Sequence, residues 1–173
     1  YGVRFAPRTR AATPEEAVAA AEALGLPVVV KVDGVAHKAR AGGVVLDLAT
    51  TEAVRDAAAR LGGAVLVARQ LPTAPEVFCG MTRDPDYGPI IAVGRGGVAI
   101  EELGGAVWCA GPVGHETARA LVRQAGIDQA VDAIADTLVA VSRAARDHPE
   151  ILEIDVNPLL LHGETAVAVD ALV

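Results

Sequence analysis

The chain has 173 residues, of which 52% are hydrophobic and 21% are charged, and this balance excludes an intrinsically disordered segment. A chain of this length buries roughly two thirds of its unfolded surface, so it can form a core without disulfides. The 22 Asp and Glu residues outnumber the 15 Lys and Arg residues. The resulting net charge of −7 argues against nucleic acid or an anionic membrane as the main partner. No apolar run approaches the roughly 20 residues of a membrane-spanning helix.

The two cysteines favour a reducing compartment. Cys79 and Cys109 have no C-x-x-C spacing and no neighbouring histidine cluster, so we expect two free thiols rather than a disulfide or a zinc site. A cytoplasmic location follows as an expectation. The chain begins at Tyr1 with no charged-then-apolar leader, so we also expect no signal peptide and a piece of a longer polypeptide.

The first part of the chain predicts two helices packed on one face of a small sheet. Thr13-Pro14-Glu15-Glu16 combines an N-cap hydroxyl, a proline in the first turn and an acidic residue three positions after the cap. Glycines follow both predicted helices, as is typical of helix C-termini. The expected helices are 14–24 and 51–61, and the expected strands are 27–32, 44–48 and a strand beginning at 64.

The second part predicts a larger sheet with one long helix on it. The apolar positions of residues 128–146 recur every three or four residues, which indicates a helix with one buried face. Trp108 is expected in the core, with stacking on a nucleobase as the alternative. The expected strands are 76–82, 90–93, 98–100, 106–109 and a terminal hairpin of 151–156 with 166–169. We therefore predict an α+β fold with two lobes, about 1–75 and 76–173.

Basic side chains in three places are candidates for phosphate binding. Lys31 interrupts an otherwise apolar strand, and a buried ammonium needs an anion or a route to water. The segment His37-Lys38-Ala39-Arg40-Ala41-Gly42-Gly43 combines cations with glycines that let backbone N–H groups approach a phosphate. Arg95 lies in Gly94-Arg95-Gly96-Gly97. The alternatives are a lysine that reaches solvent at a strand end and an ordinary basic surface turn.

Oxygen donors gather near the C-terminus. Period-two alternation places Glu153, Asp155 and Asn157 on one face of a strand, and Asp170 can join them across the terminal hairpin. Carboxylate and amide oxygens are ligands that Mg²⁺ takes alongside nucleotide phosphates. A solvated polar strand face is the alternative.

These motifs, in this order along nearly the whole chain, resemble the ATP-grasp domain of ADP-forming acyl-CoA synthetases, relatives of the succinyl-CoA synthetase β chain. The matching segments are Tyr1-Gly2-Val3, residues 13–31, His37-Lys38, Gly42-Gly43-Val44, Thr82-Arg83-Asp84-Pro85, Tyr87-Gly88-Pro89, Gly94 to Val98, Glu101, Glu153 to Leu159, and Val169-Asp170.

The resemblance implies an ATP-grasp fold, two lobes with a nucleotide cleft between them, and a phosphoryl-transfer role. Acyl-CoA, ADP and phosphate would interconvert with free acid, CoA and ATP through a phosphohistidine on a CoA-binding and ligase module, in cis or in trans. The cofactors would be ATP or ADP and Mg²⁺. The implied metal ligands are Asn157 and Asp170, with Asp155 and Glu153 assisting; the implied nucleotide ligands are Lys31, Lys38, Arg40, Gly42, Gly43, Gln70, Arg95 and Glu101; and His37 is a candidate second phosphate relay.

The chain departs from the family pattern at three points. Val67-Ala68-Arg69-Gln70 stands where relatives usually have Val-Gln-Glu-Met, and an arginine cannot accept a hydrogen bond from the adenine amine. Cys109 stands where an arginine is usual, and two stretches, Lys31 to His37 and Arg123 to Asp128, are short. A degenerate ATP-grasp domain that regulates or binds, for example fused to an acyltransferase, is therefore the alternative to an active module.

Overall fold

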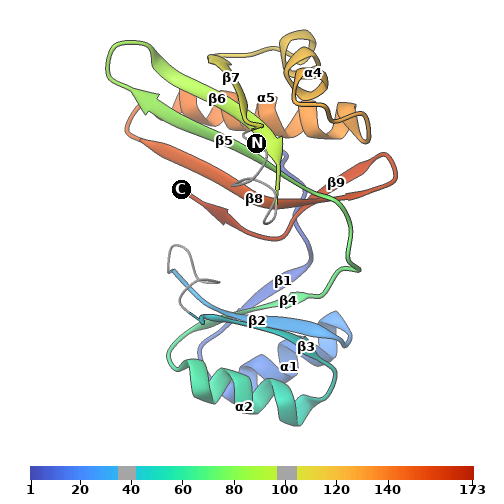
Figure 1. The fold of residues 1–173 in the computed structure, drawn as a ribbon. Coiled ribbons are helices and arrows are strands. Elements are labelled where there is room, and N and C mark those ends of the chain that lie inside the picture. The colour runs from blue at the N-terminus through green and yellow to red at the C-terminus, as the bar shows by residue number, and fades with distance from the viewer. Residues whose placement is uncertain (35–41, 97–104) are drawn as a thin grey trace. The chain divides into compact units, whose positions relative to one another are not determined.

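The computed structural model describes residues 1–34, 42–96 and 105–173, and these residues form two compact units (Figure 1). The smaller unit is Ala6–Pro72, and the larger unit is Thr73–Val173 together with Tyr1–Phe5. Residues 1–5 join the larger unit because Phe5 forms a parallel bridge with Ala168, whose backbone N–H donates to the Arg4 carbonyl at 2.8 Å. The sequence predicts these five residues in the first lobe, whereas in the structure they belong to the larger unit.

The smaller unit is an antiparallel sheet of four described strands with two helices on one face. The strand order is β1-β4-β2-β3. The core between the layers combines valines of β2 and β4 with alanines of both helices, so the helices lie close to the sheet. The elements are β1 (Arg8–Ala11), α1 (Pro14–Leu24), β2 (Val28–Val32), β3 (Val44–Leu48), α2 (Thr51–Leu61) and β4 (Val65–Arg69).

Both helices of this unit begin at a threonine cap. The Thr13 hydroxyl accepts a hydrogen bond from the Glu16 N–H at 3.2 Å, and the Thr50 hydroxyl accepts one from the Ala53 N–H at 3.2 Å. The Glu16 carboxylate also accepts from the Ala12 N–H at 2.7 Å, so two N–H groups at the start of α1 are satisfied. Gly25 ends α1 with a φ of 81°, a conformation that favours glycine.

The larger unit contains a sheet in the order β10-β8-β5-β6-β7, with β9 pairing the far end of β8. Helices α4 and α5 pack on one face of this sheet, and the main core of the molecule lies between them and the strands (Figure 1). We call the opposite face of the larger sheet the open face. The elements are β5 (Glu76–Asp84), β6 (Gly88–Arg95), β7 (Val107–Ala110), α4 (His115–Gln124), α5 (Val131–Asp147), β8 (Glu153–His162), β9 (Thr165–Ala168) and β10 (Ala171–Leu172).

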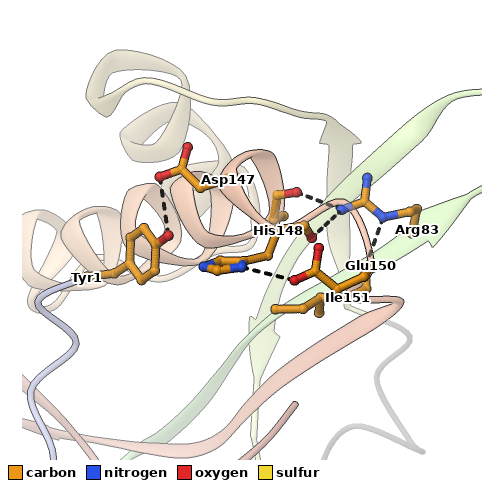
Figure 2. A network of polar contacts seen from close by, with 7 residues as sticks. Tyr1, Arg83, Asp147, His148, Glu150 and Ile151 are labelled. Atoms are coloured by element: carbon orange, nitrogen blue, oxygen red, sulfur yellow. Dashed lines mark hydrogen bonds and ion pairs between the residues drawn. The ribbon is translucent and has the colours of Figure 1, made fainter.

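Arg83 joins the β5–β6 hairpin to the connection between α5 and β8 (Figure 2). Its Nε donates to the Ile151 carbonyl at 2.9 Å, and its Nη2 donates to the carbonyls of Ala145 at 2.6 Å and His148 at 3.2 Å. The last carbonyls of a helix lack partners within the helix, and they favour a nearby positive charge. Arg83 therefore caps α5 and holds the segment that leads into β8.

The described helices include none that is both long and apolar enough to cross a bilayer.

Candidate functional site

The first half of β8 separates core residues from polar ones. Ile154 and Val156 are buried in the core beneath the helices. Glu153, Asp155 and Asn157 alternate with them and lie on the open face, Glu153 exposed and the other two half-buried. The alternation that the sequence predicts is thus present in the structure.

A β-bulge interrupts this alternation at Asn157-Pro158. Val156 pairs with Cys79 and Leu159 pairs with Val77, so β8 has one residue more than β5 between these two pairs. Val156 and Leu159 are both fully buried, whereas the two residues between them are half-buried. The extra residue lets two consecutive positions turn away from the core. Proline within an apolar strand is the sequence signal for such an irregularity.

Asp170 lies directly beside Asn157. Strand β9 pairs with the second half of β8, and β10 then pairs with the first half, with Ala171 opposite Val156. In the gap between β9 and β10, the Asn157 N–H donates to the Asp170 carbonyl at 3.3 Å. The terminal hairpin therefore brings the two residues together, through the backbone that leads into β10 rather than through β9 as the sequence suggested.

These residues fit a magnesium ion that is bound together with a phosphate ligand. Among the described residues, no group of three or more His, Cys, Asp or Glu side chains is close enough to form a metal cage. Asn157 and Asp170 supply one amide and one carboxylate, and Mg²⁺ typically takes one or two carboxylates while water and substrate phosphates complete its shell. The donor set suits that arrangement and not an all-protein metal centre.

A hollow of about 760 Å³ lies on the open face, and the carboxylates of Glu153 and Asp155 are part of its lining. It runs across β5, β6, β7 and the start of β8. Its lining includes Phe78, Gly80, Thr82, Asp84, Tyr87, Ile90, Ala92, Trp108, Ala110, Glu153 and Asp155. We call it the sheet hollow.

Trp108 is part of this lining, and the expectation that it lies in the core is wrong. Its side chain is 68% exposed. Strand β7 lies at the edge of the described sheet, and its residues Val107 and Cys109 pack against the core, so Trp108 between them faces the open side. Sequence alone does not tell which face of an edge strand is covered.

Lys31 is a buried charge in the smaller unit. It lies on β2 between Val44 of β3 and Leu66 of β4, and it is 5% exposed. Val28 and Val30 on the same strand belong to the core under the helices, so Lys31 lies on the opposite face of this sheet. Among the described residues it is the one charged side chain that is buried. Burial of an ammonium is costly unless anionic or polar groups surround it, and the role of Lys31 at a phosphate stays a prediction.

Gln70 is held by another side chain of the smaller unit. Its Nε2 donates to Asp47 Oδ1 at 2.6 Å, and its Oε1 accepts from the Asp47 N–H at 2.7 Å. Both ends of the amide are therefore engaged, and binding of an adenine amine would use the remaining lone pair of Oε1. Arg69, at the end of β4, is exposed.

Two glycines end the segment His37 to Gly43, which the sequence predicts to bind phosphate. Gly42 has a φ of 70°, and the Gly43 carbonyl accepts a hydrogen bond from the Val32 N–H at 2.9 Å, which anchors the end of this segment to β2.

Arg95 contacts the helical side of the larger unit. Its Nη2 donates to the carbonyl of Gly126, just after α4, at 2.5 Å. On β6 it follows the buried residues Ile91 and Val93 at two-residue spacing, which places it on the face opposite Glu153 and Asp155. A role at a phosphate would require this contact to break, and the assignment stays a prediction.

Four of the predicted ligands lie outside the described residues: His37, Lys38, Arg40 and Glu101. The predicted strand 98–100 lies outside them as well.

Both cysteines are free, as the sequence predicts. Burial raises the pKa of the Cys79 thiol, and the nearby Asp155 carboxylate raises it further. Burial also raises the pKa of Cys109, which is half-buried on β7. Neither sulfur has the lowered pKa that marks a nucleophilic cysteine, so the site chemistry belongs to the oxygen and nitrogen donors.

Comparison with known proteins identifies the family. A model of the ATP-grasp domain matches residues 1–173. The β subunit of the ADP-forming acetate–CoA ligase I of Pyrococcus furiosus is 34% identical, over 99% of this chain and 84% of that subunit. A trans-feruloyl-CoA synthase of an unknown prokaryotic organism is 36% identical, and the match spans 99% of this chain but only 28% of that protein.

A solved structure agrees with these matches. Acetyl-coenzyme A synthetase 1 of Ca. Korarchaeum cryptofilum superimposes with a TM-score of 0.84 and 28% identity, over 99% of this chain and 84% of that one. That structure is a complex with coenzyme A and Mg-AMPPCP, and its phosphohistidine segment points towards the nucleotide binding site. The family model, the relatives and this fold lead to one conclusion: the chain belongs to the ATP-grasp domains of ADP-forming acyl-CoA synthetases.

Proposed function

We propose that this chain is the nucleotide-binding, phosphoryl-transfer module of an ADP-forming acyl-CoA synthetase. It binds Mg-ADP or Mg-ATP and exchanges a phosphoryl group with a phosphohistidine on a CoA-binding and ligase module, located in the same polypeptide or in a second subunit. The observation that carries the proposal is the pairing of Asn157 with Asp170 beside the open-face carboxylates of β8, in a chain of this family. Two free thiols favour a cytoplasmic setting.

The final strands supply the oxygen donors in this proposal. Asn157 and Asp170 would hold Mg²⁺, which neutralises phosphate charge when bound. Asp155 and Glu153, on the same face of β8, would orient the group that exchanges phosphate. Phosphoryl transfer requires positioning and charge neutralisation rather than covalent chemistry by the protein, and these side chains are suited to both.

The front half of the chain supplies the cations. Support for Lys31 as a phosphate ligand comes from its burial on the face of the smaller sheet that α1 and α2 leave uncovered. The segment from His37 to Gly43 is proposed to close over the phosphates, with His37 as a second relay. The further nucleotide ligands that we propose are Gln70, Arg95 and Glu101.

The test has two stages. Mg-ADP or Mg-ATP should raise the melting temperature, because a ligand that binds only the folded state stabilises it by about 2.7 kcal/mol at a hundredfold excess over its Kd. The labelled phosphoryl group of a phosphorylated CoA-binding module should then appear in ATP when this chain and Mg-ADP are added. A failure of every nucleotide to shift the melting temperature would remove the proposed function.

A second candidate is a degenerate ATP-grasp domain that acts as a binding or regulatory module, for example fused to an acyltransferase. The engagement of both ends of the Gln70 amide by Asp47 favours it, because an acceptor for the adenine amine is then partly used. The two candidates differ in the second stage of the test: a nucleotide shift without any transfer of the phosphoryl group identifies the regulatory module.

A further inference from the structure

The sheet hollow concentrates the aromatic residues of a chain that has few of them. The sequence contains one Trp, two Tyr and two Phe. Trp108, Tyr87 and Phe78 all line the hollow. Trp108 and Tyr87 are 68% and 76% exposed, although each could bury a large apolar area. Exposed aromatic side chains gathered in one concave surface are typical of a binding site for another molecule.

Local structure fixes the backbone that carries Trp108 and Tyr87. Trp108 projects from β7, which is hydrogen-bonded along β6 from Ile90 to Val93. Tyr87 lies in the β5–β6 turn, where the Asp84 carboxylate accepts from the N–H groups of Asp86 at 2.8 Å and Tyr87 at 2.9 Å. A ring on an ordered turn or strand loses little conformational freedom when a partner covers it, which makes it an effective anchor.

The charge of the hollow restricts what can occupy it. Its lining contains the carboxylates of Asp84, Glu153 and Asp155, and the described lining residues include no Lys, Arg or His. Such a surface attracts cations and repels a free polyphosphate. A second copy of this chain is also disfavoured, because a symmetric contact through the hollow would bring the carboxylates of the two copies together.

We propose that the sheet hollow is the docking surface for the CoA-binding partner module, which inserts an apolar side chain between Trp108 and Tyr87 and places Lys or Arg beside the carboxylates. This inference rests on the proposed function, because that function requires a partner. Glu153 and Asp155 belong both to the hollow and to the polar face of β8. A docked partner therefore lies next to the strand that carries Asn157.

The aromatic contacts are tested with Trp108→Ala and Tyr87→Ala. Leu152→Ala is the matched control, because Leu152 is 70% exposed but does not line the hollow. The probe is the purified CoA-binding module of the same organism, and its affinity is measured by calorimetry. Truncation of a buried interface aromatic typically costs a factor of ten or more in affinity, so we expect at least a tenfold rise in Kd for Trp108→Ala and no change for Leu152→Ala.

The charge contribution is tested with Asp84→Asn. The amide oxygen of Asn can still accept the two turn hydrogen bonds, so this variant removes the charge and retains the position of Tyr87. We expect a Kd about threefold higher at low salt and the same as that of the parent at about 1 M salt, where surface charges are screened. An affinity that is independent of this charge at low salt contradicts the electrostatic part of the proposal.

The remaining outcomes separate this inference from the proposed function. Unchanged affinity of both aromatic variants overturns the docking surface, and phosphoryl transfer by those variants then leaves the proposed function intact. Loss of the Mg-nucleotide melting shift in Trp108→Ala identifies the hollow as a nucleotide subsite and overturns the docking role. Conversion of a dimer to a monomer by Trp108→Ala, seen by sedimentation, identifies a second copy as the occupant. A parent chain that does not bind the module at all removes both proposals.

Discussion

Replacing Arg83 with Ala removes a guanidinium that donates three hydrogen bonds to the carbonyls of Ala145, His148 and Ile151 (Figure 2). Two of these bonds are partly buried, and a bond from a charged donor contributes roughly 1.5–3 kcal/mol when its loss leaves the acceptor unsatisfied. The favourable interaction with the C-terminus of α5 adds about 0.3–1 kcal/mol. Because water reaches part of the vacated space, we expect Arg83→Ala to lower the free energy of unfolding by about 3 kcal/mol. A lysine has one ammonium in place of the planar fork, so Arg83→Lys should recover less than half of this loss.

The assay is urea and thermal unfolding followed by circular dichroism. For a chain of this length each kcal/mol lowers Tm by roughly 2–4 °C, so Arg83→Ala should melt about 6–12 °C below the parent. Arg146→Ala is the control, because Arg146 lies near the same end of α5 but makes an exposed ion pair with Asp147, and exposed ion pairs contribute little to stability. An Arg83→Ala variant as stable as Arg146→Ala would refute the assignment of Arg83 as the cap of α5.

Two further outcomes are expected from the ionisable groups. The hydrogen bond from Arg146 lowers the pKa of Asp147 from its ordinary 3.8, and the charges of Arg146 and Arg143 and the Tyr1 hydroxyl act in the same direction. The contribution of this carboxylate to stability is therefore present above that ordinary pKa and is lost as the pH falls through the lowered one. Asp147→Asn should lower Tm more at about pH 6 than at about pH 2.5, and equal losses at both pH values would count against this explanation. Burial raises the pKa of Cys79, so a thiol-reactive disulfide reagent should label Cys79 only after unfolding, and rapid labelling of Cys79 itself in the native chain, with Cys109 counted separately, would contradict the burial.

The elements with strong local signals could be predicted from the sequence. Helix α1 begins at Pro14 and ends at Leu24, as its cap and terminal glycine indicate, and α2 and β3 also have the predicted bounds. The sequence does not predict helix α4, because its N-cap residue is Gly114, which has no side chain to cap the helix. The start of α5 was predicted at Asp128, but the helix begins at Val131, after Ala130 in a left-handed conformation without a side-chain cap.

Strand β1 was missed for a different reason. Three of its four residues are exposed, so Arg8-Thr9-Arg10-Ala11 lacks the apolar alternation that marks a half-buried strand. Its pairing with β4 is a tertiary contact that the local sequence does not encode.

The candidate site was predictable where it depends on strand alternation and not where it depends on tertiary pairing. Glu153, Asp155 and Asn157 share a face, as their spacing predicts. The bulge at Asn157-Pro158 depends on pairing with β5, and the sheet hollow depends on which face of β7 the helices cover. Pro158 signals an irregularity in β8, but the register with β5 that makes it a bulge is a tertiary contact. The hollow cannot be deduced from the local sequence, because a strand does not specify which of its faces will be covered.

The most direct test of the proposed function is the magnesium dependence of nucleotide binding in Asn157→Ala and Asp170→Ala. The melting temperature of each variant is measured without ligand, with ADP, and with ADP plus Mg²⁺, next to the parent and to Asp136→Ala, which removes an exposed carboxylate of α5. We expect both site variants to remain folded without ligand and to lose the Mg²⁺-dependent part of the shift, while Asp136→Ala retains it. If both site variants respond to Mg-ADP as the parent does, Asn157 and Asp170 do not hold the metal.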